Sequence, residues 1–260
     1  MAENIVNLTL TLRQQELIRK NGYSFWEIRE KTAVWPARET AFILVDMWDR
    51  HWCAGATARC GVLAVKINRA AREARKKGVL IVHAPSDTMD FYRSQSARER
   101  FLSGPAAGPG PEQAPVEDYP LPIDDSDGGS DTPALDSYAP NTKVWTRQTE
   151  TIEIDQDLDL VCGDEGKRLF PLLRARGIRR LIYMGVHTNM CVLNRSFGIK
   201  NALREGFTPV LARDLTDAMY NPEKPPYVNH DEGTRLVVEY IEKKYCPTVF
   251  SPVPEEEPVI

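Results

Sequence analysis

The chain has 260 residues, 42% of them hydrophobic, and a formal net charge of −4 at pH 7. This length suits one large α/β domain or two small domains with a sizeable core. Because phosphate binding needs a clustered cationic surface, the acidic balance argues against nucleic acid as the main partner. No apolar run approaches the roughly 18 residues of a membrane span. The N-terminus also lacks the basic start and apolar core of a secretory signal.

Short apolar runs alternate with amphipathic stretches from residue 41 onward, which is typical of strands alternating with helices. Strands are expected, in chain order, at 41–45, 79–82, 143–147, 180–184 and 209–212. Helices are expected at about 60–77, 165–176, 191–205 and 231–244, each followed by a glycine or a proline that ends it. Such an order predicts a mainly parallel, doubly wound sheet with helices on both faces, a three-layer α/β/α sandwich.

Three segments lie outside this repeat. Residues 1–40 have alternating apolar positions and are interpreted as an N-terminal hairpin extension of a domain that spans 41–250. A long loop insertion is expected at about 84–141, and residues 251–260 form a C-terminal tail. Within the insertion, DDSDGGSD is similar to a Ca²⁺ loop, but it lacks the glutamate twelve positions after the first aspartate, which favours a turn-rich loop.

The cysteines supply the first candidate for chemistry. There are five of them, an odd number without a CxxC pair, so a reduced, cytoplasmic protein is predicted. Cys191 is expected to follow a strand and a tight turn and to lie in the first turn of a helix. Free N–H groups and the helix dipole are expected to lower the pKa of the thiol at that position and to receive an oxyanion. Most free cysteines, however, are small buried hydrophobes.

Asp46 is the second candidate, because it directly follows the apolar strand AFILV. Open parallel sheets place their active sites at the carboxyl ends of the strands. A carboxylate there can reach a nucleophile at the end of a neighbouring strand. The alternative is that Asp46 only caps the next turn.

The segments ILVDM and GVHTNMCV resemble two signatures of the isochorismatase-like cysteine hydrolases, which include nicotinamidases. The resemblance extends from about residue 40 to 250 and implies a parallel sheet of about six strands. It also implies a non-proline cis peptide at Val186–His187, and an oxyanion hole made by the backbone N–H groups of His187 and Cys191.

The catalytic triad that the resemblance implies is Asp, Lys and Cys. Asp46 and Cys191 match it directly, but no lysine ends the third expected strand. Arg147 occupies the best-matching position there, and Lys143 lies slightly earlier. Arginine can hold Asp46 ionised through a bidentate pair but cannot shuttle a proton. Arg147 is therefore expected to supply charge and orientation, while Asp46 acts as general acid and base and Cys191 attacks the carbonyl of a small amide or ureide.

The resemblance also raises the question of a metal, since nicotinamidases bind one beside the triad. A Zn²⁺ or Mn²⁺ site is considered, and its candidate ligands are Asp49, His51, His83 and Asp87. The alternative is that these side chains form hydrogen bonds to the substrate or to the loop backbone. The substrate pocket is expected to be lined by Trp48, His51, His83, Trp145, Gln148 and His187.

Three functions stay open at this point. The first is a thiol amidohydrolase acting on a small-molecule substrate as a homo-oligomer. The second is a non-covalent enzyme that cleaves a vinyl ether, as isochorismatases do, and the third is a non-enzymatic binding or redox module with the same sheet. A dinucleotide-binding enzyme fits poorly, because no GxGxxG follows an expected strand.

Overall fold

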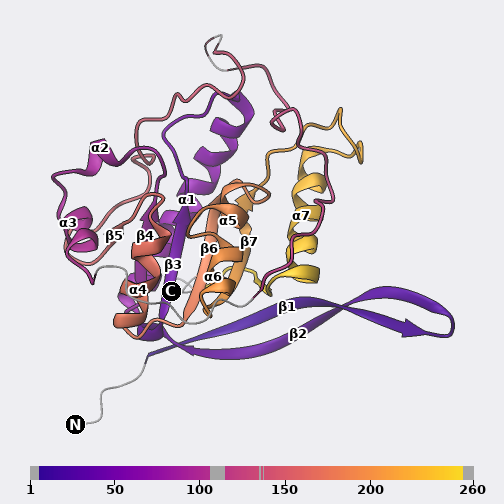
Figure 1. Ribbon diagram of the computed structural model, residues 1–260, viewed down its shortest axis with the longest axis horizontal. Coiled ribbons are helices and arrows are strands. Elements are labelled where there is room, and N and C mark those ends of the chain that lie inside the picture. Colours follow the sequence, from indigo (N-terminus) through magenta and orange to yellow (C-terminus); the bar gives the residue numbers. More distant parts are fainter. Residues whose placement is uncertain (1–5, 106–114, 135, 137, 254–260) are drawn as a thin grey trace, which may run out of the picture.

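Eight strands form one sheet in the computed structural model, which describes residues 6–105, 115–134, 136 and 138–253 (Figure 1). Their order across the sheet is β2-β1-β8-β7-β6-β3-β4-β5. The six strands from β8 to β5 pair in parallel, and the hairpin β1–β2 joins this sheet through an antiparallel pairing of β1 with β8. The strands are β1 (Asn7–Lys20), β2 (Tyr23–Pro36), β3 (Thr40–Val45), β4 (Leu80–Ala84), β5 (Leu160–Val161), β6 (Arg180–Val186), β7 (Thr208–Asp217) and β8 (Thr248–Val249).

The centre of the sheet is buried on both faces, as the apolar run in β3 predicts. Successive side chains of a strand point to opposite faces. Ile43 and Val45 accordingly pack into the core on one side of the sheet, and Phe42 and Leu44 into the core on the other. The predicted mainly parallel α/β sandwich is confirmed, and the two strands beyond the expected six are the N-terminal hairpin.

Helices cover both faces of the sheet (Figure 1). On one face, apolar residues of α1 from Cys60 to Ala74 pack against the sheet. On the other face, apolar residues of α4, α6 and α7 pack against it. A short 3-10 helix, η1 (Ala37–Glu39), precedes β3. The helices are α1 (Ala54–Lys76), α2 (Met89–Tyr92), α3 (Ser96–Leu102), α4 (Gly166–Ala175), α5 (Cys191–Asn194), α6 (Ile199–Arg204) and α7 (His230–Lys244).

The expected strand at 143–147 is wrong. These residues form a loop, and the strand that pairs with β4 is instead the two-residue β5. Val144 and Trp145 pack in a small cluster with Trp52 and Met219, while Asp49 accepts the backbone N–H of Thr146 at 2.9 Å. The β-branched and aromatic residues that suggested a strand therefore serve tertiary packing, which overrides local β-propensity.

Two further expectations need correction. The helix expected at 191–205 is interrupted, because Arg195–Gly198 separate α5 from α6. The segment 84–141 is not loop throughout, since it begins with α2 and α3. Parts of the expected segments, namely 1–5, 106–114, 135, 137 and 254–260, lie outside the described residues.

The hairpin extends away from the body of the molecule, beyond its pairing with β8 (Figure 1). Its base is fixed by Glu242 of α7, which is fully buried and accepts hydrogen bonds from Arg13 at 2.7 Å and from Gln15 at 2.9 Å. Thr248 of β8 donates to the same carboxylate at 2.6 Å. One buried carboxylate thus ties the hairpin, the last helix and the last strand together.

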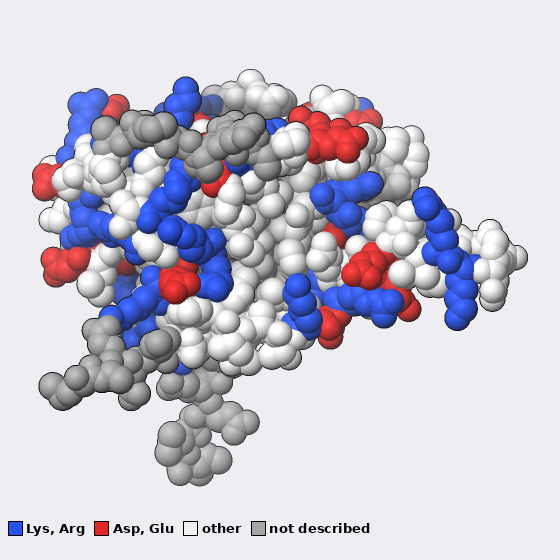
Figure 2. Space-filling view, turned by 60° about the horizontal axis from the view of Figure 1, so that its bottom comes forward, with Lys and Arg blue, Asp and Glu red and all other residues white. Residues whose placement is uncertain are grey.

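No helix within the described ranges is long and apolar enough to cross a membrane. On the face shown in Figure 2, lysine and arginine side chains are spread among acidic ones rather than gathered into a single patch. Such mixed charge on this face creates no extended cationic field of the kind that binds a phosphate backbone.

Candidate active site

The turn that carries Cys191 connects β6 to α5 at the carboxyl edge of the sheet. Gly185, near the end of β6, has a φ of +111°, and a Cβ there would lie 2.1 Å from the carbonyl oxygen of Val45. Only glycine lets β6 pass this close to the end of β3. The non-proline cis peptide expected at Val186–His187 is present. The close approach brings Cys191 and Asp46 to neighbouring strand ends.

Asp46 is fully buried and directly follows β3. Its Oδ1 accepts the backbone N–H of Ser86 at 2.7 Å, and its carboxyl group adjoins the thiol of Cys191. The backbone of Asp46 has a φ of +45°, which few residues other than glycine, asparagine and aspartate adopt. Asp46 therefore does more than cap the next turn, because it also contacts the candidate nucleophile.

The cation beside this pair is Arg195. Its Nε lies 3.4 Å from Oδ2 of Asp46, and its two terminal nitrogens lie 3.3 Å from Asp164 and 3.2 Å from Asp87. Each guanidinium nitrogen thus faces a different carboxylate. Because arginine stays protonated in proteins, Arg195 supplies a permanent positive charge at the site.

The electrostatics of the pair set its resting protonation. Burial raises the pKa of Asp46 from 3.8 to about 6, and the positive charge of Arg195 opposes this rise. Burial and the neighbouring Asp46 raise the pKa of the Cys191 thiol above its usual value of 9.0. The expectation of a depressed thiol pKa is therefore wrong. The helix that begins at Cys191 is only four residues long, and its dipole does not outweigh desolvation.

A cleft of about 460 Å³ reaches Cys191 from the surface. Among the five cysteines, the other four are buried and only Cys191 is partly exposed. The cleft has the size of a small-molecule site. Its lining is polar for the most part: Leu121, Asp125, Asp164, Asn189, Met190, Cys191, Asn194, Arg195 and Ser196.

Neither cation proposed from the sequence holds Asp46. Arg147 pairs with Glu150 at 2.6 Å, and its guanidinium carbon lies 5.0 Å from the ring centroid of Phe91. Lys143 donates to the backbone carbonyl of Asp87. Both positions were inferred from a strand that does not form. Their place beside Asp46 is taken by Arg195.

None of the six expected pocket residues lines the cleft at Cys191, but four of them lie together. The rings of Trp48 and Trp145 are stacked with centroids 4.2 Å apart, and His51 stacks on Trp145 at 5.7 Å. His187 meets His51 edge to face at 5.1 Å. Burial lowers the pKa of His51 to about 4 and that of His187 to about 3, so both rings are neutral at pH 7.

The other two expected pocket residues face away from this cluster. His83 is fully buried; its Nδ1 lies 2.9 Å from Oε1 of Gln148 and its Nε2 lies 3.0 Å from Oδ2 of Asp159. Arg75 of α1 also donates to Asp159, at 2.7 Å. His83 and Gln148 therefore belong to a polar network that joins α1 to the edge of the sheet.

The residues considered as metal ligands do not fit a metal. Asp49 accepts hydrogen bonds from Thr146 with both carboxylate oxygens, and both ring nitrogens of His83 are engaged. His51 accepts the N–H of Cys53 through Nδ1, and Asp87 pairs with Arg195. Within the described ranges, no three His, Cys, Asp or Glu side chains are grouped as a metal would require.

The acidic loop at 124–131 is held by hydrogen bonds within its own turns and by single side-chain contacts with the rest of the protein. Asp124 and Asp127 accept backbone N–H groups two residues ahead, both at 2.9 Å. Asp125 accepts a hydrogen bond from Asn189 at 2.8 Å, and Asp131 pairs with Arg59. These carboxylates are spread over separate partners, as a turn-rich loop requires.

The amides expected to form the oxyanion hole are His187 and Cys191. Neighbouring amides have acceptors: the N–H of Thr188 donates to Asp217, and those of Met190 and Val192 both donate to the carbonyl of His187. For the amide of Cys191 we find no acceptor among the described residues. Unpaired donors beside a thiol can receive the negative charge of a tetrahedral intermediate.

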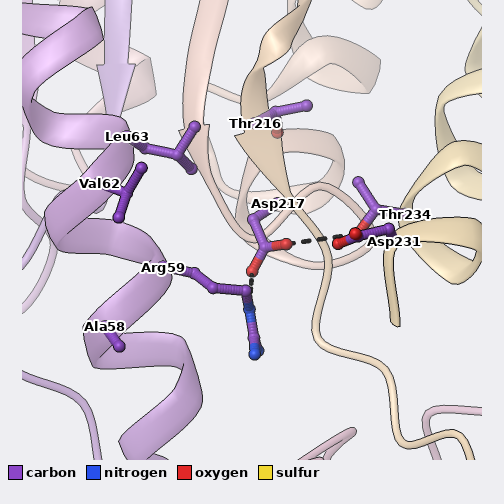
Figure 3. A pocket seen from close by; sticks show the side chains of 8 residues that line it. All are labelled: Ala58, Arg59, Val62, Leu63, Thr216, Asp217, Asp231 and Thr234. Atoms are coloured by element: carbon purple, nitrogen blue, oxygen red, sulfur yellow. Dashed lines mark hydrogen bonds and ion pairs between the residues drawn. The ribbon is translucent and has the colours of Figure 1, made fainter. Parts of the chain in front are cut away.

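A network of charged side chains, which we call the brace, lies next to the turn that carries Cys191. Its members are Arg59, Asp131, Asp217 and His230. Arg59 of α1 donates to Asp217 at 2.9 Å and to Asp131 at 2.8 Å, and His230 of α7 lies 2.9 Å from Asp217. Figure 3 shows Arg59 and Asp217 meeting in a pocket of about 390 Å³ between α1 and the start of α7. The backbone carbonyl of Asp217 accepts the N–H of Thr188 at 2.9 Å. The brace thereby fixes the turn that carries Cys191.

We expect Arg59→Met to lower the free energy of unfolding by about 2–3 kcal/mol, because it leaves the mostly buried carboxylates of Asp131 and Asp217 without this cation. Urea denaturation followed by circular dichroism measures the loss. Arg72→Met is the matched control on the same helix: its partner Glu153 is 3.6 Å away and both side chains are more than half exposed. That change should cost no more than about 0.5 kcal/mol. Equal losses for the two variants would show that the brace is unimportant.

Sequence reasoning missed Arg195, the cation of the site. The signal was available, because Arg195 follows Cys191 by four positions, and residues so spaced on a helix lie on one face. It also missed Ser86 and Asp164, which lie in loops after β4 and β5. Nothing in their local sequence distinguishes them from ordinary turn residues.

No protein-family model matches this sequence, and no curated protein matches it. Its structure is similar to that of a cysteine hydrolase from Pseudomonas syringae pv. phaseolicola 1448A, with 17% identity, a TM-score of 0.51 and coverage of 83% of this chain and 90% of that one. An isochorismatase from Pseudomonas putida KT2440 has 13% identity, a TM-score of 0.47 and coverage of 83% and 89%. For an N-carbamoylsarcosine amidase from Thermoplasma acidophilum the values are 14%, 0.43, 84% and 99%.

Proposed function

We propose that this chain, which has the fold of the isochorismatase-like cysteine hydrolases, is itself a hydrolase with Cys191 as its nucleophile. One observation carries the proposal: the one partly exposed thiol among the five cysteines, Cys191, lines a cleft and adjoins the buried carboxyl group of Asp46. A nucleophile within reach of a base that is itself held in place is the arrangement that nucleophilic catalysis needs. Here Ser86 and Arg195 hold the base.

In the first step the Asp46 carboxylate takes the proton of the Cys191 thiol, and the sulfur attacks the carbonyl carbon of the substrate. The pKa values of the two groups are both raised by burial, so the proton stays on sulfur until a substrate arrives. Negative charge then moves to the carbonyl oxygen. The amides of His187 and Cys191 are the donors that we assign to this oxygen.

The substrate class follows from the second half of this step. The C–N bond of an amide or ureide breaks only when the departing nitrogen receives a proton. Asp46, protonated by the thiol, is the donor, and its pKa of about 6 suits both uptake and release near neutral pH. The thioester left on Cys191 is then cleaved by water. A small amide or ureide is therefore the substrate that we propose.

A panel of small primary amides and ureides, followed by ammonia release, tests the proposal. Incubation with each compound should also add an acyl group to the wild-type protein, and peptide mapping should place it on Cys191. Cys191→Ala is the blank throughout. Turnover of a panel member by that variant at the wild-type rate would refute the covalent mechanism.

The dependence of kcat/KM on pH should follow the ionisation of Asp46. Only the carboxylate can take the thiol proton, so activity is expected to be low below pH 5 and to rise through about pH 6, since burial raises the pKa of Asp46 to that value. Initial rates in constant-ionic-strength buffers measure the profile. A flat profile between pH 4.5 and about 7.5 would show that Asp46 is not the base.

A further inference from the structure

A small cavity lies next to Asp46, on the side of the sheet covered by α1. Its volume is about 10 Å³, and its walls come from the segment after β3, the start of α1 and the cis turn. Such a volume holds about one water molecule and nothing larger. The residues around it are Asp46, Trp48, Arg50, His51, Ala56, Thr57, Cys60, Val186 and His187.

His187 is one of the residues that line this cavity. The residue is 2% exposed, and its Nε2 is buried without a hydrogen-bond partner among the described residues. A buried polar nitrogen left unpaired costs free energy, so native proteins satisfy such atoms with protein groups or with ordered water. The cavity beside it is the space in which a water molecule can do this.

Thr57 and the Nδ1 of His51, which also belong to the wall, already have partners. Thr57 donates to the carbonyls of His51 and Cys53 and accepts the N–H of His51. His51 accepts the N–H of Cys53 through Nδ1. The carboxyl group of Asp46 and the Nε2 of His187 are the groups that can hold a water, and two partners meet the requirement of a buried water site.

We propose that the cavity between Asp46 and His187 holds one water molecule, and that this is the water which hydrolyses the thioester on Cys191. The inference rests on the proposed function and assigns His187 as the positioning residue of its second step. Asp46 links the two places, because it lines the cavity and its carboxyl group adjoins the Cys191 thiol.

The Asp46 carboxylate takes one proton from the water, and the water oxygen forms a bond to the thioester carbon. The C–S bond then breaks, the electron pair leaves with sulfur, and Asp46 returns the proton to the thiolate. The products are a carboxylic acid and the neutral Cys191 thiol, and His187 keeps its protonation state throughout.

The test uses p-nitrophenyl acetate, whose ester acylates a reactive thiol and releases a coloured nitrophenolate. In His187→Leu we expect a burst of nitrophenolate with a rate within about threefold of wild type, and then a steady rate lowered about ten- to a hundredfold. Acetyl-Cys191 should accumulate and be visible by intact mass. His187→Gln keeps a polar atom beside the cavity and should recover most of the second step.

Hydroxylamine gives a control within the same variant. It attacks the thioester from the open cleft and does not need the buried water, so it should restore turnover of His187→Leu. Equal losses in the burst and steady rates, or a steady rate like that of wild type, would overturn the assignment of His187. Failure of wild type to form any acetyl adduct on Cys191 would instead overturn the proposed function. A crystal structure of the wild type with no ordered water in the cavity would also refute the site.

Discussion

Cys191→Ala should abolish hydrolysis of any amide that the wild type turns over, with a loss in kcat on the order of 10⁴-fold or more, because no other group can form the acyl intermediate. The fold should persist, since the side chain is partly exposed and loses one sulfur atom. The assay is ammonia release from the best amide of the panel. Release of nitrophenolate from p-nitrophenyl acetate should lose its burst as well.

Cys162→Ala is the matched control for this loss. Cys162 is fully buried in the core, and burial raises the pKa of its thiol. Its loss should lower stability by about 1 kcal/mol and leave kcat within about threefold of wild type. A covalent mechanism requires the two variants to differ. If Cys191→Ala kept its turnover, a non-covalent reaction by Asp46 alone would be the better explanation.

Arg195→Met should give the second largest loss. The change removes the charge that faces Asp46, Asp87 and Asp164 while keeping a chain of similar length. The positive charge of Arg195 holds down the pKa of Asp46, so without it that pKa rises above about 6. We expect kcat/KM at pH 7 to fall about a hundredfold and the midpoint of the pH profile to move upward.

Two comparisons make the Arg195 result specific. Arg195→Lys keeps the charge but not the three-way contact, so its pH profile should stay near that of wild type while kcat/KM falls by only about tenfold. Arg235 is an exposed arginine of α7 that pairs only with Glu232 and Glu239 in the described structure. Arg235→Met should therefore change neither the pH midpoint nor kcat/KM. A fall in rate for Arg195→Met with an unmoved pH midpoint would show that Arg195 does not act through Asp46. Replacement of Arg147 should leave the midpoint of the pH profile unchanged, because Arg147 pairs with Glu150 and not with Asp46.

The sequence predicted two residues of the candidate site, Asp46 and Cys191, from the strands that precede them. The apolar run before Asp46 and the strand and turn before Cys191 specify two parallel strands, and parallel strands meet at one edge of the sheet. The cis peptide at Val186–His187 followed from the resemblance of the turn and is present. The alternation of apolar runs with amphipathic stretches likewise predicted a mainly parallel sheet with helices on both faces.

The tertiary structure decided which cation accompanies the pair. Residues 143–147 have the composition of a strand, yet they pack as a loop on Trp52 and Met219, and Arg147 is carried away from Asp46 with them. Long-range contacts, which no local pattern records, select the two-residue β5 instead. Arg195 reaches Asp46 because the helix after Cys191 breaks there and three carboxylates from separate loops surround its guanidinium.

The sequence by itself thus predicted the candidate nucleophile, its carboxyl neighbour and the sheet that joins them, since these depend on the order and periodicity of strands. The resting protonation of the site depended on the tertiary structure. A helix start predicts a lowered thiol pKa, whereas burial beside Asp46 raises it. Desolvation is a property of everything packed around a group, and it is therefore decided only when distant segments of the chain come together.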